Sequence, residues 1–456
     1  MTEGPENAEA EWVPVTDRQR PPSIVQLAWP AVLSNLLFAT VGFVDIKIVG
    51  SLGPSAVAAT TTGNRIFFLT EAILMAITAG TTAMVARAWG AGDRKEADRV
   101  TFVSIVLCGA LAVALSALSV IFAYELAGLY QLPEETIRQA ASFIRWLGVF
   151  TVFLSLSMVL GTALRAAGDT MTPLWVGAIT NVLNVFLVYG FVYGQFGFPA
   201  LGVKGAALAS GLAFSVGAIL LLWMWLRGRL LLGFDATDAF GIDRMRRLFH
   251  IGYPAALEQA VWQVGFLGFL WVVALYGTAP YVAYGIGVQI LAFSFVVGHG
   301  LSIAAATHVG QSLGAGDPEG ATASGWRAMR IGIAGMSALG IGIIAIAEPI
   351  ARFMIDDAEV VRLIVVFIYI LGSVQPLMAI EFGLGGALRG AGDTRFPLYI
   401  ILTGLIGVRV TLAGLAAWLG WPVEWIFAVL IFDYMVRSAL FTRRFARGHW
   451  KAIGLS

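Results

Sequence analysis

The sequence has few charged residues and almost no cysteine. Charged residues make up 12% of the 456 positions, about half the roughly 25% of an average soluble domain. This composition excludes a disordered chain and an ordinary soluble enzyme. Basic and acidic residues nearly balance at a net charge of +1, which gives no support for a nucleic-acid binder. The single cysteine, Cys108, excludes an intrachain disulfide, and we expect it to be a small buried side chain within its apolar run.

Several functional signatures are also absent. The first 23 residues are polar and acidic rather than basic and then apolar, so they do not resemble a signal peptide, and we expect a disordered cytoplasmic tail there. The sequence contains no GxxxxGK[ST] phosphate-binding loop, so ATP is not the expected energy source. Histidine and cysteine do not cluster at zinc-binding spacing. We therefore expect neither a metal centre nor a cofactor.

Long apolar segments dominate what is present. Hydrophobic residues make up 58% of the chain, and residues 259–316 contain no charged side chain. A helix needs about 20 mostly apolar residues to cross a bilayer. Glycine, proline and charge clusters divide the chain into twelve predicted spans: 24–50, 56–88, 100–124, 137–164, 172–194, 203–227, 247–276, 281–313, 324–350, 359–388, 396–418 and 423–443.

The basic residues orient these spans. Only Arg138, Lys204, Arg352 and Arg362 fall in the predicted outer loops, whereas most of the 29 Lys and Arg residues fall in inner segments, to which we also assign Arg437. By the positive-inside rule this bias places both termini in the cytoplasm. We expect a multi-pass protein of the cell (inner or plasma) membrane.

Two halves of the chain repeat one another. GAGD occurs at 90–93 and again at 314–317, and LRAAGDTMTPL at 164–174 resembles LRGAGDTRFPL at 388–398. Both pairs are separated by 224 residues. Glycine suits the end of a helix and aspartate the start of the next one, so we expect these motifs to be structural turns.

The repeat predicts the architecture. Each half holds six predicted spans, so both halves insert in the same orientation, and such parallel repeats enclose a central cleft that opens to each side in turn. We expect an all-α polytopic membrane protein with twelve transmembrane helices in two six-helix lobes, related by a pseudo-two-fold axis along the membrane normal. This architecture is typical of secondary transporters. The predicted segments are a cytoplasmic tail (1–23), an N-lobe (24–227), a cytoplasmic linker (228–246), a C-lobe (247–443) and a cytoplasmic tail (444–456).

These motifs resemble those of the multidrug and toxic compound extrusion (MATE) family. The resemblance includes GFVDIKIVGSLG, GTTAMVARAWGAGD, AAATHVGQSLGAGD and VRSALFTRRFARGHW, and it covers roughly residues 24–450. It implies a prokaryotic, DinF-like antiporter, not an enzyme, that exports organic and often cationic compounds in exchange for H⁺ or Na⁺. The implied partners are small organic molecules and the lipid bilayer, and we expect a monomer.

Asp45 is the first functional candidate. It lies late in the span 24–50, where a charge costs about 2.5–3.5 kcal/mol on insertion scales. Apolar surroundings disfavour its charged form, so it is the predicted proton carrier, and the resemblance gives it the family's acidic position in this span. A proton and a cationic substrate could compete for it. The alternative is a structural carboxylate paired with Lys47 or Arg65.

Four further polar residues are predicted to surround Asp45. In proton-coupled members of the family an Asn and an Asp, one turn apart, flank the first-span carboxylate. Here Thr180 and Asn184 take those places, so a second carboxylate is missing. Asn181 is adjacent, and Ser210 is included by its position in the family pattern. The alternative for each is a hydrogen bond between helices.

The substrate cleft is expected to draw polar residues from both lobes. The candidates are Asn35, Glu71, Glu258, Gln259, Trp262, Gln263, Gln289 and Glu381. Glu258 and Glu381 are the alternative coupling site, since two facing carboxylates with amide oxygens suit a hard cation such as Na⁺. Trp262, Phe269 and Tyr284 could line the cleft and bind organic cations through their ring faces.

Two other classes remain as alternatives. A flippase for lipid-linked precursors is also built from many helices in two lobes, but an anionic head group would favour a cleft rich in Arg or Lys. The N-lobe instead carries Asp45 and Glu71 within its spans. A polytopic enzyme would need catalytic groups on sizeable aqueous loops, which the short outer loops do not provide. We favour an H⁺-coupled exporter.

Overall fold

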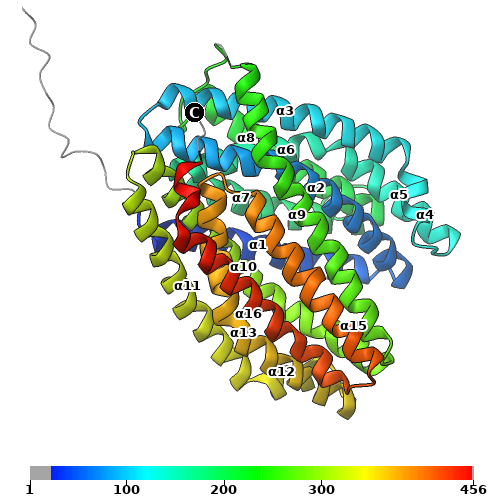
Figure 1. The fold of residues 1–456 in the computed structure, drawn as a ribbon. Coiled ribbons are helices and arrows are strands. Elements are labelled where there is room, and N and C mark those ends of the chain that lie inside the picture. Colours follow the sequence, from blue (N-terminus) through cyan, green and yellow to red (C-terminus); the bar gives the residue numbers. More distant parts are fainter. Residues whose placement is uncertain (1–21, 238, 454–456) are drawn as a thin grey trace, which may run out of the picture.

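The computed structural model describes residues 22–237 and 239–453, and helices make up nearly all of this part of the chain (Figure 1). The predicted N-terminal tail therefore lies almost wholly outside the described residues. The elements are α1 (Ile24–Gly50), α2 (Pro54–Gly90), α3 (Arg94–Ile121), α4 (Ala123–Gly128), α5 (Glu134–Val149), α6 (Thr151–Ala167), α7 (Met171–Tyr193), α8 (Val203–Leu226), α9 (Ile242–Ala274), α10 (Thr278–Gly314), α11 (Pro318–Ala345), α12 (Ala347–Met354), α13 (Ala358–Gly390), α14 (Arg395–Ile401), the π-helix η2 (Leu402–Val410), α15 (Thr411–Trp418), α16 (Val423–Arg447) and the 3₁₀-helix η3 (His449–Ala452).

Twelve spans follow from these elements, as the sequence predicts. Eleven helices are long and apolar enough to cross a membrane, with α14, η2 and α15 forming one of them, and the pair α5–α6, bent by 49°, supplies the twelfth within the described residues. Most helix ends lie within four residues of the predicted ones, but several do not. α3 begins at Arg94 and α11 at Pro318, each six residues earlier than predicted, and α11 ends at Ala345, five residues earlier. α9 begins at Ile242, five residues earlier, so the linker is shorter than predicted.

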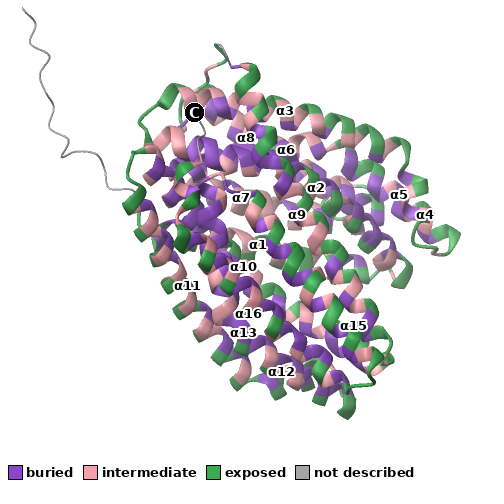
Figure 2. Cartoon of the chain, viewed as in Figure 1, coloured by how far each residue is buried: buried purple, intermediate pink, exposed green. Residues whose placement is uncertain are grey.

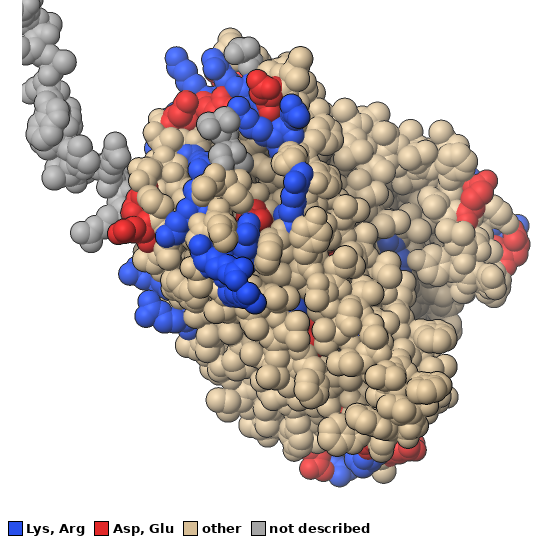
Figure 3. Space-filling view, in the orientation of Figure 1, with Lys and Arg blue, Asp and Glu red and all other residues tan. Residues whose placement is uncertain are grey.

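The spans form two bundles that lie side by side (Figure 1). We call α1–α8 the N-lobe and α9–η3 the C-lobe. The end of the molecule with the start of α1 and the end of α16 is the terminal end, and the opposite one is the distal end. The lobes meet at the terminal end and diverge toward the distal end, where α4 and α5 lie apart from α12 and α15. The space-filling view is hollowed between these two arms (Figure 3).

The GAGD motifs are structural turns, as predicted. Gly92 and Gly316 adopt φ angles of 76° and 73°, a left-handed conformation that favours glycine. Asp93 accepts a hydrogen bond from the backbone N–H of Glu96 at 2.9 Å. Asp317 caps α11 in the same way. Each motif thus ends one long helix and starts the next.

The first glycine of each GAGD motif also joins the lobes. A Cβ added to Gly90 would lie 1.9 Å from the carbonyl oxygen of Gln311, and one added to Gly314 would lie 2.0 Å from that of Arg87. Both contacts bring α2 and α10 backbone to backbone, as small residues do in membrane proteins. Gly90 and Gly314 are related by the 224-residue offset, and so are Arg87 and Gln311. The repeat therefore builds one pseudo-symmetric contact at the terminal end.

Further contacts between the lobes lie in the same half of the molecule. Gly252 of α9 packs against the backbone of Ala76, and Gly300 of α10 packs against Val32 of α1. Arg87 donates a hydrogen bond to the carbonyl oxygen of Ile453 at 2.7 Å. These contacts close the molecule at the terminal end.

The linker between the lobes is attached to α3. Arg244 at the start of α9 bonds both carboxylate oxygens of Glu96, at 2.9 and 2.6 Å. The backbone N–H of Gly233 donates to Asp98 at 2.7 Å, and Arg99 pairs with Asp235 at 3.1 Å. These contacts hold Gly233, Asp235 and Arg244 against α3 at the terminal end.

Burial and charge follow a membrane pattern. Buried residues lie inside each lobe and exposed ones cover the outer faces (Figure 2). The exposed residues include large apolar side chains such as Trp175, Trp271 and Trp418, which are 63, 66 and 81% exposed, as expected for contact with lipid. Charged residues gather at the two ends in this view, with the basic ones mainly at the terminal end (Figure 3). Cys108 is buried, as predicted.

Candidate functional site

Asp45 and Asn184 form a polar pair inside the N-lobe. Asp45 lies on α1 and accepts a hydrogen bond through Oδ2 from Nδ2 of Asn184 on α7, at 2.9 Å. Asn184 is buried and Asp45 is partly exposed. Asp45 Oδ1 and Asn184 Oδ1 are buried without a hydrogen-bond partner. The pair thus offers two free oxygens, and no ion pair of the described residues neutralises Asp45.

The other three predicted neighbours do not bond to Asp45. Thr180 donates its hydroxyl to the carbonyl oxygen of Val176 on its own helix at 2.9 Å, and it packs against Gly217 of α8. Asn181 and Ser210 are partly buried and make no side-chain hydrogen bond within the described part of the chain. The structure therefore brings only Asn184 into direct contact with Asp45.

The C-lobe holds a network of buried charges. Glu258 on α9 pairs with Arg389 on α13 at 2.5 Å, and Glu381 on α13 pairs with Arg437 on α16 at 2.8 Å. Asp433 on α16 joins the network, because it accepts hydrogen bonds from both Arg437 and Arg409. Three carboxylates thus balance three guanidinium groups inside one lobe.

Of these six residues, only Glu258 and Glu381 were named as functional candidates from the sequence. Arg437 was assigned to an inner segment, but it is fully buried in the middle of α16, so that assignment is wrong. Asp433 was not singled out at all. Their spacing of four residues, which places them on one face of a helix, is the signal that could have identified the pair. Arg409 reaches Asp433 from η2, a π-helix, and π-helical turns often occur at functional positions.

The network bears on the alternative sodium site. Glu258 and Glu381 each face an arginine in this structure, and each keeps one oxygen, Oε2, without a hydrogen-bond partner. Among the described residues no group of three or more His, Cys, Asp or Glu side chains is arranged to hold a metal ion. A cation at these carboxylates would therefore have to share them with Arg389 and Arg437.

The remaining cleft candidates differ in how far their side chains are exposed. Trp262 is turned into the C-lobe, with its ring 5.1 Å from the guanidinium of Arg437. Asn35, Glu71 and Gln259 are partly exposed, and Gln263 and Gln289 are exposed.

Phe269 and Tyr284 were expected to line the cleft, and this expectation is wrong. They are 0 and 2% exposed, and their rings pack together inside the C-lobe with centroids 5.3 Å apart. The apolar packing of α9 against α10 explains their burial.

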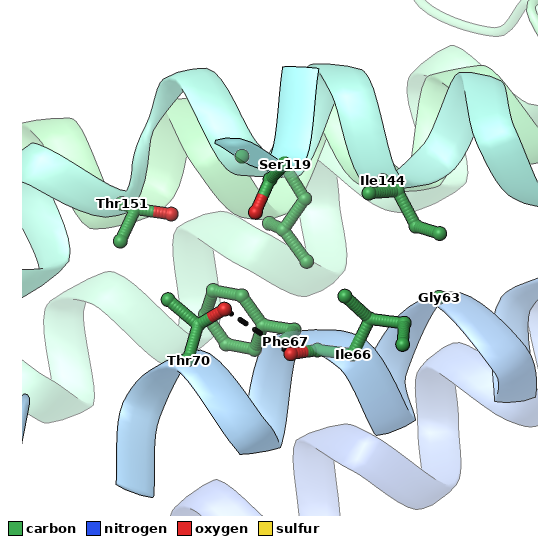
Figure 4. A pocket seen from close by; sticks show the side chains of 9 residues that line it. Gly63, Ile66, Phe67, Thr70, Ser119, Ile144 and Thr151 are labelled. Atoms are coloured by element: carbon green, nitrogen blue, oxygen red, sulfur yellow. Dashed lines mark hydrogen bonds between the residues drawn. The ribbon is translucent and has the colours of Figure 1, made fainter. Parts of the chain in front are cut away.

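A small pocket of the N-lobe contains none of the candidate residues (Figure 4). It lies between α2, α3, α5 and α6, next to the bend that separates α5 from α6. The hydroxyl of Thr70 donates to the carbonyl oxygen of Ile66 at 3.2 Å, and Ser119 and Thr151 lie across from it. These polar groups belong to the packing within the lobe.

Comparison with known proteins begins with a family model. The model described as MatE matches the chain twice, at residues 30–190 and 254–415, which together exceed half of the chain. The two matches begin 224 residues apart, which agrees with the internal repeat.

Relatives resemble the chain over most of its length. A protein of Thermotoga maritima described as a probable multidrug resistance protein NorM is 29% identical over 94% of this chain and 92% of its own length. A multidrug resistance protein NorM of Burkholderia vietnamiensis is 28% identical, with 84% of each chain covered.

Solved structures share the fold. The MATE transporter VcmN of Vibrio cholerae in its bent form superposes with a TM-score of 0.86 at 21% identity, covering 94% of this chain and 97% of that one. A MOP superfamily transporter from Pyrococcus furiosus superposes with a TM-score of 0.85 at 19% identity, covering 93% and 94%.

Twelve helical spans in two similar lobes are typical of polytopic membrane transporters. The two family matches identify the family: the chain belongs to the MatE family, the MATE transporters, and is therefore a transporter and not an enzyme. Within that family, the DinF-like subtype stays a prediction.

Proposed function

We propose that this protein is a secondary antiporter that exports organic, often cationic, drugs or toxic compounds in exchange for H⁺. The pairing of charges carries the proposal. Of the three carboxylates predicted as coupling residues, Glu258 and Glu381 have arginine partners, whereas Asp45 has only the neutral amide of Asn184. A carboxylate without a counter-charge gains most from binding a proton in an apolar environment. Asp45 is therefore the proposed coupling residue.

The proposed transport cycle follows from the closed terminal end. The positive-inside rule assigns the terminal end, where basic residues gather, to the cytoplasm. Both termini then lie on the cytoplasmic side of the cell membrane. The contacts of Gly90 and Gly314 then close the cytoplasmic side, while the lobes are apart on the outer side. With this orientation, we infer an outward-facing state, in which substrate leaves and a proton enters.

Proton binding would act at the Asp45–Asn184 pair. Protonation converts the charged acceptor into a neutral group, so the hydrogen bond from Asn184 loses its charge assistance. A neutral Asp45 also costs less to bury. Because the pair joins α1 to α7, the change alters the packing of two helices of the N-lobe. We propose that this change favours the return to the inward-facing state.

Sodium coupling is the second candidate. It is supported by the free oxygens Glu258 Oε2, Glu381 Oε2 and Gln375 Oε1, which are buried in the C-lobe without hydrogen-bond partners. Oxygen ligands of this kind suit a hard cation. The arginine partners of both carboxylates weigh against it, because a guanidinium already occupies one side of each group.

Efflux from proteoliposomes tests the proposal. Purified wild type, Asp45→Asn and Glu258→Gln would be given either a pH gradient or a Na⁺ gradient with a fluorescent drug. We expect efflux driven by the pH gradient in wild type and none in Asp45→Asn. Efflux driven only by Na⁺, retained in Asp45→Asn and lost in Glu258→Gln, would replace proton by sodium coupling. No drug movement under either gradient by folded protein would bring the flippase forward.

A further inference from the structure

Glu71, like Asp45, is a carboxylate within a membrane span of the N-lobe that has no counter-charge among the described residues. It lies near the middle of α2, between Pro54 and Gly90, and it is partly exposed. Within the described residues it has neither an ion pair nor a hydrogen bond to another side chain. A charged side chain at this depth is costly and is usually retained for a function.

The contacts of α2 with α9 indicate where Glu71 lies relative to the second lobe. Met75 Sδ lies 4.0 Å from Nε2 of Gln259 on α9, and the backbone of Ala76 abuts Gly252. Glu71 precedes Met75 by one turn on the same face of α2, and Gln263 follows Gln259 by one turn on α9. Because α2 runs toward the terminal end and α9 away from it, Glu71 and Gln263 both lie one turn on the distal side of the contact. They therefore lie where the lobes begin to separate, at the floor of the cleft.

Neutral and aromatic side chains also lie near this floor. Gln263 is exposed, and Phe68, one turn from Glu71 toward the distal end, is 49% exposed. On α1, Asn35 follows Val32, which packs against Gly300 of α10. Amide oxygens and an aromatic face can both contact an organic cation, and Glu71 would supply the one negative charge.

Glu71 and Asp45 lie at different depths. Asp45 is five residues before the distal end of α1 at Gly50, and Glu71 is seventeen residues after the distal start of α2 at Pro54. At 1.5 Å per residue the two carboxylates differ by about 18 Å in depth. A small drug bound at one carboxylate therefore does not have to touch the other.

We propose that Glu71 binds the positive group of the substrate at the floor of the cleft, while Asp45 carries the proton. The substrate class is organic molecules with a single positive charge, since Glu71 offers one carboxylate. This inference rests on the proposed export function and changes its mechanism. Substrate and proton do not compete for one carboxylate, but are coupled through the conformation of the N-lobe.

Equilibrium binding of ethidium, a permanent organic monocation, tests the inference. The full-length protein in detergent would be compared with Glu71→Gln, Glu71→Asp and Asp45→Asn, and with the exposed control Glu319→Gln. We expect Glu71→Gln to weaken binding about tenfold or more, and Glu71→Asp, which keeps the charge, to bind within about threefold of wild type. Asp45→Asn should keep its ethidium affinity and lose transport driven by a pH gradient.

Two results would overturn the inference. One is unchanged ethidium binding by folded Glu71→Gln, and the other is a larger loss of binding in Asp45→Asn than in Glu71→Gln. The melting temperature of each variant shows that it is folded, and neutralising the unpaired Glu71 leaves no partner charge exposed. The failure of the export proposal looks different, because then even the wild type moves no drug under either gradient.

Discussion

Asp433 lies between two arginines, so that one buried carboxylate is the counter-charge of two guanidinium groups. Its oxygens accept hydrogen bonds from Arg409 on η2 and Arg437 on α16, and all three side chains are at most 2% exposed. The charges compensate one another only as a set. Breaking such a buried pair by removing one partner costs far more than losing an exposed ion pair.

Asp433→Asn should therefore destabilise the protein strongly. We expect a loss of about 3–5 kcal/mol, because two guanidinium groups lose their shared counter-charge in the apolar interior. The melting temperature in detergent measures it. The matched control is Glu348→Gln, which breaks the exposed pair with Arg352 and should cost about 0–1 kcal/mol. Equal melting temperatures for the two variants would contradict this view of the network.

At this scale the sequence predicted polar contacts better than charge networks. The contact of Asp45 with Asn184 was predictable, because both are polar residues within apolar helices and the family pattern pairs them. The position of Arg437 was not, because a basic residue ten positions before the end of α16 resembles one that reaches the membrane surface. Its true depth depends on Asp433 and Glu381, which only the folded structure brings near it.

At the scale of whole helices, the sequence again predicted some features and not others. Apolar length and glycine–aspartate turns predicted all twelve spans. The bend between α5 and α6, the π-helix η2 and the short helices α4 and α12 were not predicted. Bends and π-turns are fixed by packing against neighbouring helices, which local composition does not report. The sequence predicted that the GAGD glycines form turns. It did not predict that Gly90 and Gly314 also bring α2 and α10 together between the lobes.

Gly90→Ala should disturb the closure of the terminal end. Alanine is the better helix former, but its Cβ would lie 1.9 Å from the carbonyl oxygen of Gln311, so α2 and α10 must move apart. We expect a shift away from the outward-facing state. Spin labels at Leu129 and Phe353, which are exposed at the distal ends of the two lobes, should then show a population with a shorter distance in a Cys108→Ala background.

Gly109→Ala is the control for this experiment. No atom lies within 4 Å of a Cβ at Gly109 in α3, so the substitution should leave the distance distribution unchanged and stabilise the helix slightly. An unchanged distribution in Gly90→Ala would show that the glycine contact does not hold the terminal end closed.

For the molecule as a whole, the 224-residue repeat predicted two lobes but not how symmetric they are. Arg87 and Gln311 occupy equivalent positions, yet they bond differently. Gln311 donates to the carbonyl oxygen of Ala166, whereas Arg87 donates to that of Ile453 in the C-terminal segment. The conformational state was not predictable either, because both states of a transporter are built from one sequence.

Arg87→Gln should weaken this second contact between the lobes. The shorter side chain loses the hydrogen bond to Ile453, worth about 1.5–3 kcal/mol when the donor is charged. The same distal labels should show a larger inward-facing population than in wild type. Arg94→Gln, which removes the contact with Trp89 within the N-lobe, should leave the distance distribution as it is. The interpretation fails if both variants shift it equally.

The central claim is that Asp45 carries the proton that is exchanged for substrate. Its most direct measurement is proton flux itself, followed with a pH-sensitive dye inside proteoliposomes when ethidium is added without a preset gradient. We predict that wild type moves protons in the direction opposite to ethidium and that Asp45→Asn moves none, while Glu258→Gln still does. Proton flux that persists in Asp45→Asn, or ethidium transport by wild type without any proton flux, would contradict the account.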